Sequence, residues 1–185
     1  MPKEIINFLW ASNAIVVENI YWGQHSTIFG DIIVAATDHG VCAVEFCDAN
    51  KKEVILKRIA KTWTKAKLSE NLNATKRYAD TVFVLPNESI DQKAITIHIF
   101  GSPFQQAVWQ ALLEIPFGDQ KSYRSIAEDA GNPSASRAVG SAVGANPIAV
   151  LIPCHRVVHS DGQLGNYHWG KQLKRDLIEW EKSQS

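Results

Sequence analysis

The sequence predicts an α+β protein in which a small mixed α and β half is followed by a mostly helical half. Up to about residue 100, short apolar runs with strand spacing alternate with segments of helical spacing. Beyond residue 102 the pattern is one helix after another, separated by turns that contain glycine or proline. We therefore expect two domains, residues 1–100 and 101–185, and the 45% hydrophobic content suits an ordinary buried core.

The first half is expected to hold a β-hairpin, two helices and a further strand. Two apolar runs within residues 28–47 flank the TDHG segment at 37–40, whose composition is typical of a tight reversal. Helical spacing follows over residues 51–63 and again over 72–84. Residues 94–100 alternate like a strand that has one polar face.

The second half is expected to begin with three helices. The first starts at Pro103, which suits the first turn of a helix, and ends before the PFG segment at 116–118. The second runs from residue 122 or 123 to residue 130. A GNP segment ends it, and Ser134 caps a third helix that must stop before Pro147. Two short helices joined by a glycine-containing turn predict a helix-turn-helix.

The third helix has unusually little side-chain bulk. Its small residues are Ala135, Ala138, Gly140, Ser141, Ala142, Gly144 and Ala145. Either a neighbouring helix packs closely against it, or the backbone of a ligand approaches it. Local charge favours a nucleic acid, because residues 132–175 contain five bases and one acid, Asp161. The five bases are Arg137, Arg156, Lys171, Lys174 and Arg175.

Composition excludes several other classes of protein. Nineteen Lys and Arg balance nineteen Asp and Glu, so net charge indicates no polyanionic partner. We expect no signal peptide, and no apolar run approaches the roughly 18 residues of a membrane span. Three irregularly spaced cysteines make no disulfide framework. A reducing compartment follows, cytoplasmic, or nuclear if the source is eukaryotic.

The segment IAVLIPCHRVV at 148–158 is the candidate for chemistry. It is strand-like on both sides of Pro153, with Cys154 and His155 adjacent. The neighbouring imidazole and the guanidinium of Arg156 predict an electropositive setting that lowers the pKa of Cys154 from about 8.5 and favours the reactive thiolate. A Cys-His pair alone says little, since neighbouring strand residues point to opposite faces.

The motifs around this pair resemble one family. FQQAVWQAL, IPFG, SYRSIAEDAGNP, SRAVGSAVGANP, IPCHRVV and GNYHWG, between about Ser102 and Glu181, are similar to the O6-alkylguanine-DNA alkyltransferases, also called methylated-DNA-protein-cysteine methyltransferases. The first hundred residues match only in broad pattern. The resemblance implies a ribonuclease-H-like N-terminal domain and a winged-helix-like C-terminal domain that binds DNA and holds the reactive cysteine.

The resemblance also implies the reaction. A methyl or small alkyl group passes irreversibly, once per protein molecule, from O6 of guanine, or O4 of thymine, in double-stranded DNA to Cys154. His155 removes the thiol proton through a water, Glu181 orients His155, and Asn146 ties this network to the turn before the cysteine. Tyr123 donates to the departing base. No cofactor is expected, and the protein is expected to act as a monomer.

For DNA, the resemblance implies that the third helix enters the minor groove and that the nucleotide is flipped out. Arg137 fills the vacated space, and Ser134, Ala135, Ser141 and Tyr123 also contact the DNA.

In the substrate pocket, backbone groups near Val157 and His168 read the guanine edge, with Tyr167 beside them. Trp169 stands where some family members carry small residues, so we expect a narrow pocket in which methyl transfer outpaces benzyl transfer.

No metal site is expected. Some members bind zinc in the N-terminal domain, but Cys42, Cys47, His25 and His39 lack paired-cysteine spacing. Core packing explains Cys42, and a loop position explains Cys47. Two other functions stay open: a DNA-binding regulator without chemistry, which would not need Cys154, and a cysteine hydrolase, which would need a remote histidine.

Overall fold

The computed structural model describes residues 6–12, 14–48, 50–85 and 94–184, and these form two compact units. One unit comprises the described residues up to Phe100 together with residues 147–149. The other comprises Gly101–Asn146 and the described residues from Val150 onward. Residues 1–5, the start of the segment expected not to be a signal peptide, lie outside the described part.

The first unit is built on a mixed sheet with the strand order β1-β6-β4-β3-β2-β5. Its strands are β1 (Ile6–Trp10), β2 (Asn19–Thr27), β3 (Gly30–Thr37), β4 (Gly40–Phe46), β5 (Lys67–Glu70) and β6 (Ile95–Ile99). The β3–β4 pair is the expected hairpin. β1, β5 and β2, which pairs antiparallel with β3, were not predicted from the sequence.

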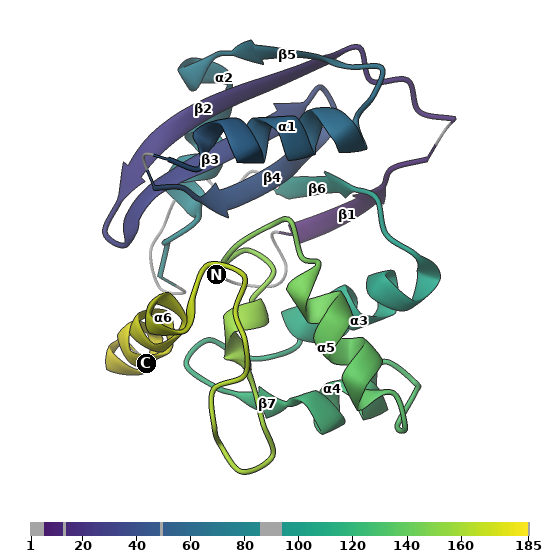
Figure 1. The fold of residues 1–185 in the computed structure, drawn as a ribbon, viewed down its shortest axis with the longest axis vertical. Coiled ribbons are helices and arrows are strands. Elements are labelled where there is room, and N and C mark those ends of the chain that lie inside the picture. Colours follow the sequence, from purple (N-terminus) through teal and green to yellow (C-terminus); the bar gives the residue numbers. More distant parts are fainter. Residues whose placement is uncertain (1–5, 13, 49, 86–93, 185) are drawn as a thin grey trace. The chain divides into compact units, whose positions relative to one another are not determined.

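Two helices cover opposite faces of this sheet. α1 (Lys52–Thr62) lies across one face, as Figure 1 shows, and buries Ile55 and Ile59 in a cluster with Trp22. α2 (Leu72–Thr81) covers the other face: it lies against Gly23, the residue of β2 that follows Trp22. Neighbouring strand residues point to opposite faces of a sheet, so Trp22 faces α1 and Gly23 faces α2. Both helices were predicted.

Two predicted features of this unit are present but buried. β6 is the predicted strand, in which the polar residues Thr96 and His98 alternate with isoleucines, but it runs parallel to both β1 and β4, and His98 is fully buried. Cys47 follows the last residue of β4, at the predicted loop position, but it is 8% exposed and belongs to the cluster under α1. Cys42 is buried, as expected.

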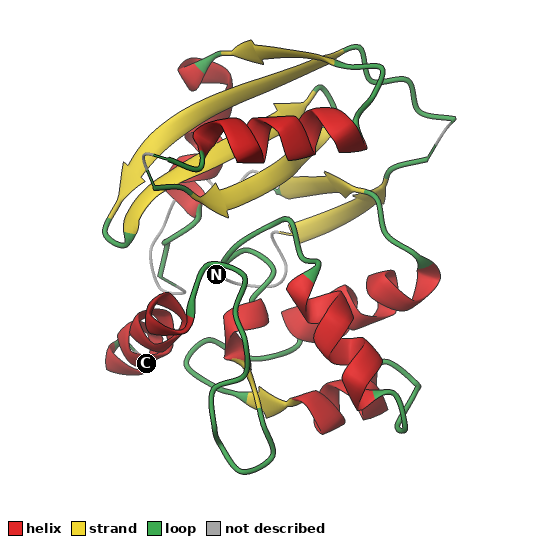
Figure 2. Ribbon diagram, in the orientation of Figure 1, coloured by secondary structure: helices red, strands yellow, loops and turns green. Residues whose placement is uncertain are grey.

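The second unit is mostly helical (Figure 2). Its helices are α3 (Pro103–Leu113), α4 (Tyr123–Asp129), α5 (Ser136–Gly144) and α6 (Lys171–Ser183). β7 (Lys121–Ser122) pairs parallel with β8 (Val157–Val158). Ser102 and Gln105 form a capping box at the start of α3, which explains why that helix begins at Pro103. Within the described part, no helix is long and apolar enough to cross a membrane.

The cap of α5 differs from the prediction. Ala135, not Ser134, occupies the N-cap position, and its side chain offers no hydrogen bond to the first turn. Ser134 lies before the helix and is exposed. The backbone N–H of Ala135 donates to the carbonyl of Asn132, so the GNP turn includes Ala135. The helix therefore starts one residue later than it would with Ser134 as its cap.

The IAVLIPCHRVV segment is mainly a compact set of turns, so the strand prediction was largely wrong. Ile148 forms one isolated parallel bridge with Val44, and β8 contains only the last two residues of the segment. Between them Val150 has a φ of 65°, a left-handed conformation that a β-branched side chain rarely adopts. Cys154–Arg156 then form a single 3-10 turn.

Candidate functional site

The sulfur of Cys154 is held at the start of this 3-10 turn. Cys154 is 2% exposed, and its backbone N–H donates to the carbonyl of Ile152 at 2.7 Å. Asn146, just after α5, donates its side-chain amide to the same carbonyl at 3.0 Å and to the Cys154 sulfur at 3.1 Å. Asn146 and Cys154 are thus in contact, and Asn146 ties the sulfur to the preceding turn.

The predicted lowering of the Cys154 pKa was wrong. Burial raises the pKa of Cys154 to about 11, and it outweighs the hydrogen bond from Asn146 and the charge of Lys174, which both lower it. The guanidinium of Arg156, which was expected to supply positive charge, is instead neutralised by a carboxylate. At rest the site holds a thiol.

His155 and Glu181 form a buried pair. The two side chains are 0% and 2% exposed, and Nε2 of His155 lies 2.8 Å from a carboxylate oxygen of Glu181. Because a carboxylate only accepts, this ring nitrogen carries the proton. The other nitrogen, Nδ1, is buried and has no hydrogen-bond partner among the described residues. Burial lowers the pKa of His155, so the ring is neutral with Nδ1 free to accept a proton.

Arg156 completes the carboxylate's surroundings. Its guanidinium donates to both oxygens of Glu181, at 2.8 and 2.9 Å, and to the carbonyl of Ile115 at 2.7 Å. The backbone N–H of Gly118 donates to Glu181 as well, at 3.1 Å. Burial alone would raise the pKa of Glu181, but the hydrogen bonds from His155 and Arg156, with the positive charge of the guanidinium, lower it to about 2. The carboxylate therefore stays ionised.

Lys174 is a member of the site that the sequence analysis counted only as surface charge. It lies on α6, is 0% exposed, and donates its ammonium to the carbonyl of Val157 at 2.6 Å. Burial lowers the pKa of Lys174 to about 8, while the Cys154 charge acts to raise it. A lysine four residues after a glycine that starts a helix carries no sequence signal of such burial.

Tyr123 faces the same region from the start of α4. Its ring centroid is 5.9 Å from the Lys174 ammonium and 5.3 Å from the His159 ring. A Cβ atom placed on Gly165 would meet the Tyr123 hydroxyl at 2.4 Å, so the backbone of Gly165 closes over it. Burial and the nearby charge of Cys154 raise the pKa of Tyr123, so the hydroxyl stays a donor.

The loop before α6 supplies the rest of the predicted pocket. Burial, followed by the Cys154 charge, raises the pKa of Tyr167 well above its usual value. The Tyr167 and Trp169 rings meet edge to face at 5.1 Å, and His168 also contacts Trp169, at 5.0 Å. His168 is exposed and Trp169 is half-buried. Tyr167 therefore lies near the sulfur, and Trp169 supports Tyr167 from the side.

One face of α5 is exposed and nearly bare. Val139, Ala142 and Val143 are buried, and Trp109 of α3 donates its indole N–H to Ala142 at 2.9 Å. The opposite face exposes Arg137, Ala138, Ser141, Gly144 and Ala145. A Cβ atom on Gly144 would touch nothing within 4 Å. Packing against α3 thus uses one side of the small-residue helix, and the other side is open.

The positive surface charge of residues 132–175 is smaller than the count of five bases in the sequence predicts. Arg156 and Lys174 are buried, at 7% and 0% exposure. Arg137, Lys171 and Arg175 remain exposed. No cluster of three or more potential metal ligands occurs among the residues that the structure describes.

The second unit thus combines a buried thiol and a buried histidine–glutamate pair with two short helices, α4 and α5, joined by the GNP turn. Comparison with known proteins identifies the family. Residues 103–183 match the family model described as 6-O-methylguanine DNA methyltransferase, DNA binding domain. A methylated-DNA–protein-cysteine methyltransferase of Methanosarcina acetivorans is 35% identical over 164 residues, which cover 89% of this chain and 99% of the relative.

Two further comparisons agree. The enzyme of the same name from Mycobacterium leprae is 53% identical over 91 residues, 49% of this chain and 55% of that protein. The crystal structure of Mycobacterium tuberculosis OGT in complex with DNA superposes with a TM-score of 0.69 at 30% identity, over 89% of this chain and 94% of that one. This chain belongs to the methylated-DNA–protein-cysteine methyltransferases.

Proposed function

We propose that this chain repairs duplex DNA by moving a methyl or small alkyl group from O6 of guanine to the sulfur of Cys154. The carbon–oxygen bond breaks as the sulfur–carbon bond forms, and the thiol proton leaves. The product is a thioether that nothing in the site reverses, so each molecule acts once. O4 of thymine, which presents an alkyl group on an equivalent exocyclic oxygen, is a second substrate of the same kind.

His155 takes the thiol proton in this proposal. Its Nε2–H is held by Glu181 at 2.8 Å, which leaves Nδ1 as the basic atom of the ring. A water carries the proton from sulfur to Nδ1. The Glu181 carboxylate then stabilises the imidazolium, as a carboxylate does beside other catalytic histidines. Because the resting thiol has a raised pKa, proton removal accompanies transfer rather than preceding it.

Lys174 stabilises the thiolate as it forms. Its ammonium is buried and electrostatically coupled to Cys154, and a charge acts more strongly in a dry site than in water. Its bond to the Val157 carbonyl also fixes the chain that follows the cysteine. We therefore add Lys174 to the catalytic set of Cys154, His155 and Glu181.

The departing guanine receives hydrogen bonds from the opposite side of the pocket. Negative charge develops on its ring, and Tyr123 offers a hydroxyl that remains protonated. Backbone groups near Val157 and His168 recognise the edge of the base. The ring of Trp169, against Tyr167, limits the size of the transferred group.

DNA binds along the open face of α5. The small side chains let the minor-groove backbone approach, and Arg137 occupies the space of the flipped nucleotide. Ser134 and Ala135 lie at the start of the helix, Ser141 lies further along its exposed face, and all three contact the strand. We further propose that the two units are domains, a ribonuclease-H-like one and a winged-helix-like one, divided near Gly101, and that the protein acts as a monomer.

The buried His155–Glu181 hydrogen bond, directly after a buried Cys154 that Asn146 contacts, carries this proposal, because a regulator without chemistry needs neither pair. The test is single-turnover transfer from duplex DNA that contains one O6-methylguanine. We expect one methyl group lost per protein molecule, and no transfer by Cys154→Ala, which still binds the duplex. Continued turnover beyond one equivalent would point to a hydrolase or another mechanism.

A further inference from the structure

We propose that the first unit carries a second, sequence-independent contact for the backbone of duplex DNA. The contact is the basic face formed by Lys57, Lys61 and Lys65, on α1 and in the turn that follows it. The proposal rests on the proposed function, since it takes DNA to be the polyanion that the protein meets. It assigns a role to a unit that holds none of the residues of the transfer site.

The charge of this region is the densest of one sign in the chain. Residues 51–67 contain seven Lys or Arg and one acid, Glu53. Residues 132–175, which include α5, contain five bases and one acid over a much longer stretch, and two of those bases are buried. The strongest positive run of the sequence therefore lies outside the unit that holds Cys154.

Three of the seven bases have partners within the unit. Lys51 pairs with Asp48 at 2.6 Å, and Arg58 pairs with the buried carboxylate of Glu45. Lys52 lies over an indole ring at 4.6 Å from its centroid. These three residues stabilise the unit itself and are not part of the basic face.

The other four are exposed and almost unneutralised. Lys57 approaches Glu53 only at 3.7 Å, with both side chains more than four-fifths exposed. Among the residues that the structure describes, no acidic side chain pairs with Lys61, Lys65 or Lys67. Like charges gathered in this way repel one another, and a polyanion relieves that repulsion.

Lys57, Lys61 and Lys65 share one side of the unit. α1 buries Ile55 and Ile59 against the sheet. Lys57 and Lys61 are one turn apart on the opposite side of the helix, so their ammonium groups extend together into solvent. Lys65 follows in the turn after α1. Lys67, the first residue of β5, is not part of this face, because its neighbour Leu68 packs against the cluster under α1 and alternate strand residues point to opposite faces.

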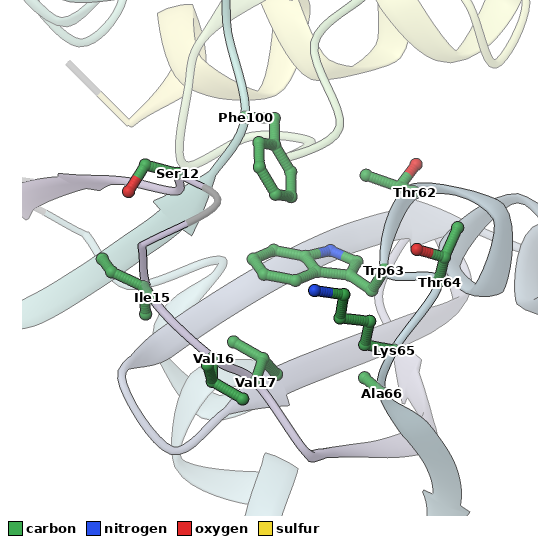
Figure 3. Close-up of a pocket in the computed structure, with 10 residues that line it drawn as sticks. All are labelled: Ser12, Ile15, Val16, Val17, Thr62, Trp63, Thr64, Lys65, Ala66 and Phe100. Carbon is green, nitrogen blue, oxygen red and sulfur yellow. The ribbon is translucent and has the colours of Figure 1, made fainter.

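A recess at the end of α1 lies beside Lys65. It has a volume of about 100 Å³, and it is lined by Lys65, by Ser12, Thr62 and Thr64, and by the apolar residues Ile15, Val16, Val17, Trp63, Ala66 and Phe100. Figure 3 shows the Lys65 ammonium group beneath the indole of Trp63, while the Ser12 and Thr62 hydroxyls point away from it. The group that this region offers to a phosphate is therefore the Lys65 ammonium, and phosphate contacts of this kind position DNA without reading its sequence.

Purely structural roles explain only part of the face. Lys61, in the last turn of α1, complements the helix dipole, but this role does not apply to Lys57 or Lys65. The negative end of the helix dipole, about half a charge, is outweighed by the full charges beside it.

The test compares two matched double variants of the full-length chain. Lys61→Gln with Lys65→Gln neutralises the basic face, and Lys76→Gln with Arg77→Gln removes the same charge from exposed positions of α2 in the same unit. Affinity for an unmethylated duplex is measured by fluorescence anisotropy from low to high salt. Transfer from free O6-methylguanine base, which involves no DNA, is measured alongside.

We expect the first variant to bind duplex DNA roughly tenfold or more weakly at 0.1 M salt, with the slope of log affinity against log salt reduced by nearly two. The control variant should match the parent, and both should keep the parent rate with the free base. Equal affinities and slopes for all three proteins would overturn this inference alone. Failure of the parent itself to bind DNA would overturn the proposed function as well.

Discussion

Cys154 works from a resting state that is almost wholly protonated. With its pKa raised to about 11 by burial, only about one sulfur in ten thousand is ionised at pH 7. An exposed thiol would ionise more readily but would also react with other electrophiles. The site therefore gains selectivity from burial and must supply the thiolate through neighbouring groups during transfer.

Lys174 should make the rate of alkyl transfer depend on pH. Its pKa is lowered by burial to about 8, so its positive charge is present below that pH and lost above it. We expect the rate of transfer from free O6-methylguanine to rise with pH below about 8 and to flatten above it as the ammonium deprotonates. Lys174→Met should be slower and lack the flattening.

Lys171→Met is the matched control, because Lys171 is exposed one turn earlier on α6. It should keep both the parent rate and the shape of the pH profile. A Lys174→Met protein with the parent's pH profile would remove Lys174 from the catalytic set.

Glu181 should control acid stability. Its folded-state pKa is depressed from 4.5 to about 2, so the stabilisation is fully present above pH 4.5 and is lost as pH falls toward 2. The shift corresponds to at most about 3 kcal/mol. Urea unfolding at pH 5, 4 and 3 should show the parent losing stability faster with acidification than Glu181→Gln, which is less stable at pH 5 because Arg156 is left without its carboxylate.

The size of the pocket is a third test at this scale. Trp169→Ala removes the ring that supports Tyr167 from the side. We expect benzyl transfer from free O6-benzylguanine to gain about tenfold relative to methyl transfer, the usual scale for relief of one steric group. An unchanged ratio of the two rates would place Trp169 outside the pocket wall.

At the scale of elements, the open face of α5 predicts that bulk harms DNA binding without harming the fold. Gly144→Leu fills space that no other residue occupies in the chain itself. It should weaken duplex affinity at least tenfold, yet leave thermal stability and transfer from the free base unchanged. Glu179→Leu, at an exposed position of α6, is the control. Equal duplex affinity of Gly144→Leu and the parent would show that DNA lies elsewhere.

Helices were predictable from sequence because their signals are local. Ser102 with Pro103 marks the start of α3, and the GNP turn separates α4 from α5. The active-site segment was not predictable in the same way, since IAVLIPCHRVV has the composition of a strand. Its turns depend on a distant partner, Val44, which forms a bridge with Ile148. They also depend on the left-handed backbone of Val150, which no local residue preference predicts.

At the scale of the whole molecule, the sequence predicted which residues meet better than how they are charged or buried. Asn146 contacts Cys154, and His155 contacts Glu181. Their joint part in the reaction stays a prediction of the family resemblance. The pKa of Cys154 and the burial of Lys174 depend on what surrounds them in three dimensions. A count of nearby bases therefore predicted a lowered pKa for Cys154, where burial raises it, and a surface position for Lys174, which is buried.

The central claim is that Cys154 itself becomes alkylated. The direct measurement is to incubate the protein with duplex DNA that contains O6-methylguanine, digest it, and weigh the peptides. We predict that the peptide containing Cys154 gains the mass of one methylene group, that the peptides containing Cys42 and Cys47 are unchanged, and that the DNA regains guanine. Loss of the methyl group from DNA with no gain on the Cys154 peptide would contradict the account.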